Sequence, residues 1–397
     1  MKKTLLLLTI VFIASCAHPN KDFYPGAFNQ QKETWTWMIY LNADNNLTDL
    51  DVLNINQLLA VEPNENINIV ILWDRSIHKD RLIQIKNKKI IDLQATINGK
   101  TFPGNTAEDV ELHTTNPQTL QDFLFYVKEN FKTDRYALTL WSHSDGWRSK
   151  TKGIGSDEND GDPITVNDGD TFLENVEIGN ALLFAGAVDV VVFDSCLQGS
   201  IETLWAMQGA NYLIASPHNV PGSGWHYYNF LTHFQNSYMR VDDFLFLAVQ
   251  SYKNYYDKQS SWEHISLVAY DISKVNKQEG PGTLKDFFNW LYDGGSPIGG
   301  EKEIFLNSYA FNSSPIKQVD LYEYIQKSQY FSDPAFKPAL LKQLKSMVVY
   351  SWVKGKEANY PAFSIAYPRP YIEHTTYKDI PFGLETKWPN ITTEWQN

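Results

Sequence analysis

Apolar and polar positions follow two alternating periods from about residue 35 onward. Short apolar runs rich in β-branched and aromatic residues are typical of buried strands, and they alternate with segments whose apolar residues recur every three or four positions, as on one helix face. The expected strands are residues 35–41, 67–72, 136–141, 188–193 and 212–215, with a hairpin over 81–93. The expected helices are residues 47–59, 120–131, 172–184 and 199–207. This alternation predicts an α/β fold with a mostly parallel sheet covered by helices on both faces.

The pattern loosens beyond about residue 230. Residues 241–256 are helix-like, residues 338–352 change from a helical to an apolar pattern, and residues 362–368 resemble a late strand. We therefore expect a core over residues 34–230 and a more helical region over 231–397, with one late strand, packed on that core.

The first sixteen residues have the pattern of a bacterial export signal. A positively charged start precedes an apolar run over residues 5–13, which is too short to cross a bilayer, because spanning needs roughly 20 apolar residues. Residues 13–16 resemble a lipobox, so Cys16 is expected to carry lipid; ordinary cleavage after Ala17 is the alternative. Residues 17–33 are expected to be a tether. The protein is then exported and lipid-anchored at the periplasmic or surface face of a bacterial membrane.

The charge balance excludes several classes of partner and chemistry. The chain has 34 basic and 46 acidic residues, a formal net charge of −12, which disfavours a groove that follows nucleic-acid phosphates. The sequence contains neither the glycine motifs of nucleotide-binding loops nor the paired-histidine motif of zinc peptidases. We expect a monomer whose chemistry needs no cofactor.

Two reactive side chains follow two of the expected strands. His143 comes after the strand over 136–141, and Cys196 after the strand over 188–193. Ligand sites in open α/β sheets form outside the carboxyl ends of the strands, so neighbouring strands would bring the thiol and the imidazole within reach. The pattern indicates a thiol nucleophile with an imidazole base. A buried structural thiol is the alternative for Cys196, since an unpaired cysteine packs as a small apolar residue.

This pair could perform acyl transfer. His143 could take the proton of the Cys196 thiol and then protonate the leaving amine. The backbone N–H groups of Ser144 and Cys196 are the candidates for stabilising the oxyanion. His218, which follows the strand over 212–215, is the rival base.

Four ordered segments resemble the marker segments of the clostripain family of cysteine peptidases. They are residues 35–47, 140–143, 193–197 and 363–368. The resemblance covers most of residues 35–370. It implies a caspase-like fold, a catalytic dyad of His143 and Cys196, and cleavage of peptide bonds, often after Arg or Lys.

The resemblance also suggests where substrate binds. Asp194 matches a family position that helps to make the substrate pocket acidic, and its carboxylate could bind a guanidinium; the alternative is a turn-forming or strand-capping role. Two positions depart from the family. Ser144 replaces the usual Gly after the catalytic His, and His226 stands where a second acidic residue often follows a Gly-Trp pair. These departures motivate an alternative function, a catalytically silent surface lipoprotein that binds peptide or glycan in the same cleft.

The segment between His143 and Cys196 is acidic. Residues 155–162 and 167–170 offer many short oxygen ligands that could hold calcium, although their spacing does not fit an EF-hand, and a solvated loop is the alternative. The resemblance implies that related enzymes can need calcium and can cut themselves in this segment, where basic residues occur at Arg148, Lys150 and Lys152.

Overall fold

The structure is a computed structural model. It describes residues 31–75, 79–105, 110–147, 154–155, 172–275, 277, 280, 282–292, 299–312, 317–329, 334–368 and 377–396. Lys32–Asn397 forms one unit, whereas Cys16 and most of the expected tether lie outside the described residues. Within the described ranges, no helix combines the length and the hydrophobicity needed to cross a bilayer.

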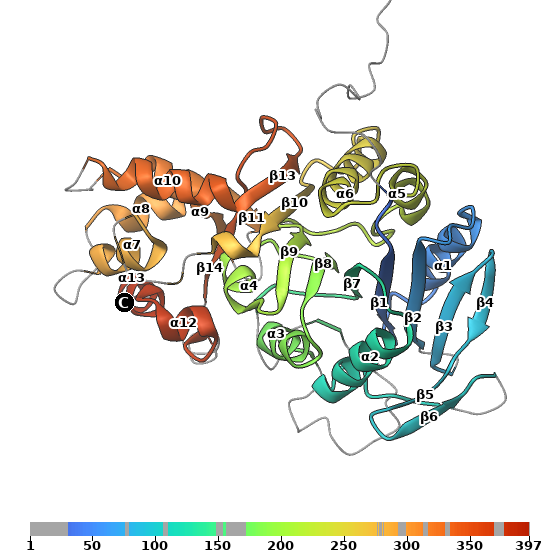
Figure 1. The fold of residues 1–397 in the computed structure, drawn as a ribbon. Helices are drawn as coiled ribbons and strands as arrows, with labels where there is room; N and C mark the ends of the chain where they lie inside the picture. The colour runs from blue at the N-terminus through green and yellow to red at the C-terminus, as the bar shows by residue number, and fades with distance from the viewer. Residues whose placement is uncertain are drawn as a thin grey trace, which may run out of the picture. The chain divides into compact units, whose positions relative to one another are not determined.

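The described strands build a nine-stranded sheet in the order β13-β10-β9-β8-β7-β1-β2-β3-β4 (Figure 1). Its first-half strands are β1 (Trp35–Ala43), β2 (Ile67–Arg75), β3 (Arg81–Lys86), β4 (Lys89–Asp92), β7 (Arg135–Trp141), β8 (Val188–Asp194) and β9 (Ala210–Ala215). The central strands β9, β8, β7, β1 and β2 are mutually parallel, and the outer pairs are antiparallel. The predicted α/β architecture with a mostly parallel sheet is confirmed.

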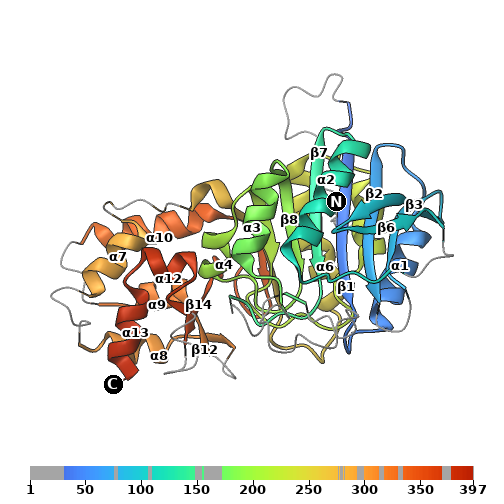
Figure 2. The same cartoon turned by 90° about the horizontal axis from the view of Figure 1, so that it is seen from below.

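Alternation along the strands divides the apolar residues between two cores. In β8, Val190 and Val192 face one core, whereas Val191 and Phe193 face the other. The first face is covered by α1 (Leu50–Ala60), α5 (Tyr227–Phe234) and α6 (Val241–Tyr256), and the second by α2 (Pro117–Asn130), α3 (Asn175–Phe184) and α4 (Ile201–Ala206) (Figures 1 and 2). Burial on both faces explains why these strands appear in the sequence as continuous apolar runs.

Local signals set the boundaries of several elements. Helix α2 begins at Pro117, and the side chain of Asn116 accepts a hydrogen bond from the amide of Gln118 at 2.9 Å, a typical N-cap. The predicted hairpin is also confirmed. Asn87 and Lys88 connect β3 to β4 with positive φ angles of 52° and 59°, which a two-residue turn between twisted strands requires.

The C-terminal part contains more strands than predicted. Strands β10 (Ser266–Asp271) and β13 (Val348–Val353) extend the central sheet, and β11 (Ala310–Asn312), β12 (Lys317–Asp320) and β14 (Ser364–Tyr367) form a second sheet. The expectation of a single late strand was wrong, because these strands are short and pair with segments distant in the sequence. Two further strands, β5 (Gln94–Ile97) and β6 (Lys100–Pro103), pair with each other.

The C-terminal part also contains several short helices among its described residues. They are η2 (Ile272–Lys274), α7 (Leu284–Leu291), α8 (Glu301–Leu306), α9 (Leu321–Lys327), α10 (Phe336–Met347), α12 (Pro381–Glu385) and α13 (Trp388–Gln396). Their apolar residues continue the core beneath α2, α3 and α4. At the start of β14, the Ser364 amide donates to the carbonyl oxygen of Gly199 at 3.0 Å. The C-terminal part therefore supports the loop that follows β8.

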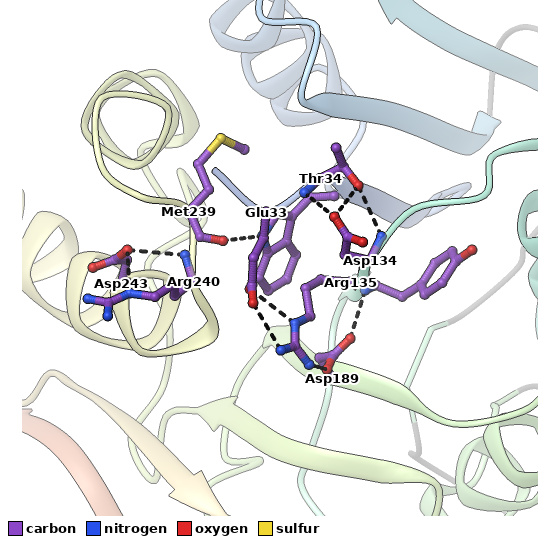
Figure 3. Close-up of polar contacts among 10 residues, drawn as sticks. Glu33, Thr34, Asp134, Arg135, Asp189, Met239, Arg240 and Asp243 are labelled. Atoms are coloured by element: carbon purple, nitrogen blue, oxygen red, sulfur yellow. Dashed lines mark hydrogen bonds and ion pairs between the residues drawn. The ribbon is translucent and has the colours of Figure 1, made fainter. Parts of the chain in front are cut away.

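Polar contacts connect the amino-terminal ends of three central strands (Figure 3). The Arg135 guanidinium lies between the carboxylates of Glu33 and Asp189, with N–O distances of 3.0 Å to each. The Asp134 carboxylate accepts hydrogen bonds from the amide and the hydroxyl of Thr34 at 2.9 and 2.7 Å. These contacts join the beginnings of β1, β7 and β8, at the opposite edge from the loops that carry His143 and Cys196.

Candidate active site

The register of the sheet places the loops after β7 and β8 side by side. Trp141 is the parallel partner of Asp194, and each is the last residue of its strand. His143 and Cys196 therefore each lie two residues beyond a paired position, at the same edge of the sheet. The sequence predicted the two strands, and their pairing in the structure brings the two loops together.

The two loops are in direct contact at Gly146. This glycine has a φ angle of 84°, and a Cβ atom built on it would lie 2.9 Å from the carbonyl oxygen of Leu197. Ser144 is not among the described residues with positive φ, so the loop takes its left-handed conformation at Gly146 and tolerates a serine after His143. Leu197 itself has a φ angle of 62°. Such strain in a non-glycine residue is frequent at functional turns.

The Cys196 thiol is partly exposed and contacts the backbone of Val220. The Val220 amide donates to Sγ at 3.3 Å, and the Val220 carbonyl oxygen lies 3.7 Å from Sγ. Burial raises the pKa of the Cys196 thiol; the Val220 N–H acts in the opposite direction, and the negative charges of Asp145 and Asp194 add to the rise. At neutral pH the thiol is therefore protonated, and a nucleophilic role requires a base.

The His143 imidazole is half-buried and contacts a third loop. Its Nε2 atom lies 2.5 Å from Oδ1 of Asn46, which follows β1. Strand β7 pairs with β1 on one side and with β8 on the other. The imidazole therefore joins the loops after β1 and β7, and β8, on the other side of β7, carries the loop of Cys196.

A buried glutamine connects the loops of His143 and Cys196. The Nε2 atom of Gln198 donates to the Ser144 hydroxyl at 2.5 Å and to the carbonyl oxygen of Gly146 at 3.1 Å. Its Oε1 atom accepts from Asn175 at 3.1 Å and from Thr203 at 2.9 Å. The fully buried amide therefore has partners on both of its polar atoms, as buried polar groups require.

Comparison with known proteins shows which family has this arrangement. A sequence model described as the clostripain family matches residues 39–377 of this chain. The chain belongs to the clostripain family. Clostripain from Hathewaya histolytica is 29% identical to it, in an alignment that covers 48% of this chain and 40% of that protein. The matched part of this chain thus spans about two fifths of that relative's length.

Solved structures of clostripain-family proteins have the same fold. An inactive zymogen C11 protease from Parabacteroides distasonis superposes with a TM-score of 0.64 at 17% identity, covering 90% of this chain and 99% of that one. A secreted C11 cysteine protease from Bacteroides thetaiotaomicron, iotapain, gives 0.65 at 16% identity, covering 89% and 99%. These likenesses confirm the caspase-like fold that the family resemblance implied.

Asp194, at the family's acidic pocket position, has a structural role here. Its Oδ2 atom accepts hydrogen bonds from the Trp225 amide at 3.1 Å and the Tyr227 hydroxyl at 2.7 Å. A Cβ atom on Gly224, whose φ angle is 58°, would lie 2.6 Å from Oδ2, so only glycine fits there. Burial raises the pKa of Asp194 to about 6, against the two hydrogen bonds that lower it. Among the described residues, its Oδ1 atom has no hydrogen-bond partner.

His226, the second departure from the family, begins helix α5. Its Nδ1 atom accepts from the Asn229 amide at 3.3 Å, and its ring packs against Tyr255 with 4.6 Å between centroids. Burial lowers the pKa of His226, so the imidazole is neutral at neutral pH. It caps the helix and brings no negative charge to this segment.

Both ring nitrogens of His218, the alternative base, have hydrogen-bond partners. Its Nδ1 atom lies 2.9 Å from the Ser266 hydroxyl, and its Nε2 atom lies 3.0 Å from the Tyr309 hydroxyl. Burial lowers the pKa of His218 to about 3. With both ring nitrogens bonded, this side chain is structural, and its backbone carbonyl oxygen supports the Leu197 amide at 3.1 Å.

The two amides predicted to bind an oxyanion lie at this edge of the sheet. Those of Ser144 and Cys196 have no hydrogen-bond acceptor among the described residues, whereas the Leu197 amide donates to His218. Two N–H groups without a protein acceptor, on the two loops that hold the reactive side chains, suit a developing negative charge.

The predicted calcium loop lies almost wholly outside the described residues. A different carboxylate cluster, which the sequence did not suggest, consists of Asp44, Asp74 and Glu111, with ligand oxygens within 4.8 Å of one another. The Thr114 hydroxyl also donates to Asp74. Hard cations such as calcium and magnesium prefer oxygen ligands of this kind.

Sequence reasoning missed two residues that contact the reactive pair, Asn46 and Val220, and it missed Gln198, which joins the two loops. Val220 and Gln198 gave no signal, because their roles depend on loops that meet only in the fold. Asn46 lies within the first family segment, residues 35–47, to which the resemblance assigns no catalytic role.

Replacing Gln198 with leucine should destabilise the protein by about 3 kcal/mol, because the buried Asn175 and Ser144 groups would lose a partner. Urea unfolding measures this change. The matched control is Gln208→Leu at an exposed position, expected to stay within about 0.5 kcal/mol of the parent. Equal unfolding midpoints for the two variants would show that the Gln198 contacts do not stabilise the fold.

Proposed function

We propose that this protein is a cysteine endopeptidase in which Cys196 is the nucleophile and His143 is the general base and acid. The observation that carries the proposal is the pairing of Trp141 with Asp194, because it brings both loops to one edge of the sheet. The direct approach of Gly146 to Leu197 supports it. Family membership adds the expectation of peptide-bond cleavage.

The reaction proceeds in two balanced steps. His143 accepts the thiol proton while Sγ of Cys196 bonds to the carbonyl carbon, and the amide C–N bond then breaks as His143 gives that proton to the leaving amine. In the second step His143 takes a proton from water, whose oxygen attacks the thioester, and the released Sγ recovers the proton. The raised pKa of the Cys196 thiol means that thiolate forms only as attack proceeds.

The backbone amides of Ser144 and Cys196 stabilise the oxyanion of both tetrahedral intermediates. They come from the two loops that Gln198 connects through its hydrogen bonds to Ser144 and Gly146. A donor of this kind contributes roughly 100-fold or more to the rate. The proposed chemistry uses only groups of this chain.

Replacing Cys196 or His143 with alanine should lower peptide hydrolysis by roughly 1000-fold or more, because each removes a member of the reacting pair. A panel of fluorogenic peptides with different residues before the scissile bond measures the loss. The matched control is His233→Ala at an exposed position, which should retain full activity. If the parent binds these peptides without turnover, the peptidase proposal is wrong and the silent binding protein is favoured.

The finer specificity that we propose is cleavage after Arg or Lys. The carboxylate of Asp194 lies beneath the Gly224–Trp225 backbone, with Oδ2 bonded to protein groups and Oδ1 unpartnered among the described residues. A guanidinium or ammonium that reached Oδ1 would gain a charge-assisted hydrogen bond. Because His226 is neutral, we propose that the negative charge for this recognition comes from Asp194.

Asp194→Asn should lower the preference for Arg over a neutral residue by about 10- to 100-fold, the value of one charged hydrogen bond. In the parent, the preference should also fall as the pH drops through about 6, because protonation removes the negative charge. The ratio of kcat/KM for matched Arg and Leu substrates measures this, since any effect of pH that is common to both substrates cancels in the ratio. If the Arg-to-Leu ratio of kcat/KM is the same in the parent and in Asp194→Asn, and the same at pH 5 and 7.5, then Asp194 has only a structural role.

We also propose that the chain is exported and carries lipid on Cys16, as the segment over residues 1–16 indicates. Cells grown with an alkyne-tagged fatty acid should label the protein, and Cys16→Ser should abolish the label. Cys196→Ala should keep it. Equal labelling of the parent and Cys16→Ser would contradict the anchor.

A further inference from the structure

Asn46 contacts the side of the His143 imidazole that bears Nε2. The Asn46 side-chain oxygen lies 2.5 Å from this nitrogen, so the ring donates its Nε2–H to the amide oxygen. The two residues are 97 positions apart in the sequence, and their contact depends on the pairing of β1 with β7.

The turn that presents Asn46 is held by its buried neighbour Asn45. The Asn45 side-chain oxygen accepts from the Leu47 amide at 3.0 Å, and its Nδ2 lies 3.1 Å from the Asn42 side-chain oxygen. The same Nδ2 lies 3.4 Å from the hydroxyl of Ser142, the residue before His143. The contact between Asn45 and Ser142 therefore connects the segments that contain Asn46 and His143.

This contact decides which nitrogen of the ring can act as a base. A neutral imidazole carries its proton on one nitrogen and a lone pair on the other, and a partner at one nitrogen selects the tautomer. With Nε2–H donated to Asn46, the lone pair is at Nδ1. Nδ1 is then the atom that receives the thiol proton.

We propose that Asn46 is a positioning residue that holds His143 as the Nε2–H tautomer, with Nδ1 directed to the reaction. The inference rests on the proposed peptidase function of His143. Because the amide is neutral, it orients the ring without adding a negative charge beside it. Cysteine peptidases of an unrelated fold use Cys, His and Asn in the same order of contacts, which shows that an amide suffices for this task.

The kinetic test compares Asn46→Ala and Asn46→Asp with the parent. Alanine removes the acceptor and should lower kcat about 100-fold with KM changed less than about threefold, because a misplaced base affects the chemical step. Aspartate keeps an acceptor of the same shape, so kcat of Asn46→Asp should be at least tenfold higher than kcat of Asn46→Ala. The control is Asn254→Ala, an exposed asparagine whose side chain also makes a hydrogen bond, expected to match the parent.

A spectroscopic test separates this inference from the peptidase proposal. Histidine labelled with ¹⁵N reports the protonated nitrogen directly, and His143→Gln identifies its signal among the nine histidines. The parent should show the proton on Nε2 of His143, and Asn46→Ala should lose this preference while thermal unfolding stays unchanged. A parent with the proton on Nδ1, or an Asn46→Ala variant with the parent's tautomer and kcat, would overturn the inference even if the enzyme is active. If Cys196→Ala remains as active as the parent while the tautomer is as expected, the peptidase proposal alone fails.

Discussion

The parallel pairing of β1, β7 and β8 is the constraint on which the site depends. Leu41 is the partner of Trp141, and Trp141 is the partner of Asp194, so β7 and β8 end at one level and β1 continues two residues further, to Ala43. A slip of one residue would move a loop by about 3.3 Å and turn each side chain of that strand to the opposite core. The two apolar cores therefore specify the register, and through it the positions of the reactive groups.

Buried polar side chains then arrange loops that contain little regular structure. Asn45 holds the first loop, Gln198 joins the second to the third, and Asp194 holds the segment around Trp225. Asn45 and Gln198 have partners on both polar atoms of their side chains, whereas Asp194 has partners on Oδ2 alone among the described residues. In the protein interior these hydrogen bonds are strong, and a missing partner is costly. Asp194 and His226, for example, each accept a hydrogen bond from a backbone amide.

The fold was predictable from the sequence where burial produced long apolar runs or clear helical spacing. Strands β1, β7 and β8 were expected within a few residues of their observed ends, and the hairpin of β3 and β4 was expected over residues 81–93. Strands β10 and β13 were not, because they pair antiparallel with segments far away in the sequence, and β13 directly follows helix α10.

The candidate site was predictable to the level of which loops carry it. Strand ends placed His143 and Cys196 at one edge, and the register agrees with that expectation. The partners of these side chains, Asn46 and Val220, could not be inferred, because hydrogen bonds between loops depend on backbone paths that no local pattern encodes. The same holds for the bond of Gln198 to Ser144.

The ion pairs of Arg135 have a mechanical consequence. The chain enters β1 through Glu33, which Arg135 holds at the amino-terminal edge of the sheet. A force applied at residue 32 along the axis of β1 would load its hydrogen bonds to β2 and β7 in shear. The sheet therefore resists such a force at its amino-terminal side, while the carboxyl ends of the strands keep their shape.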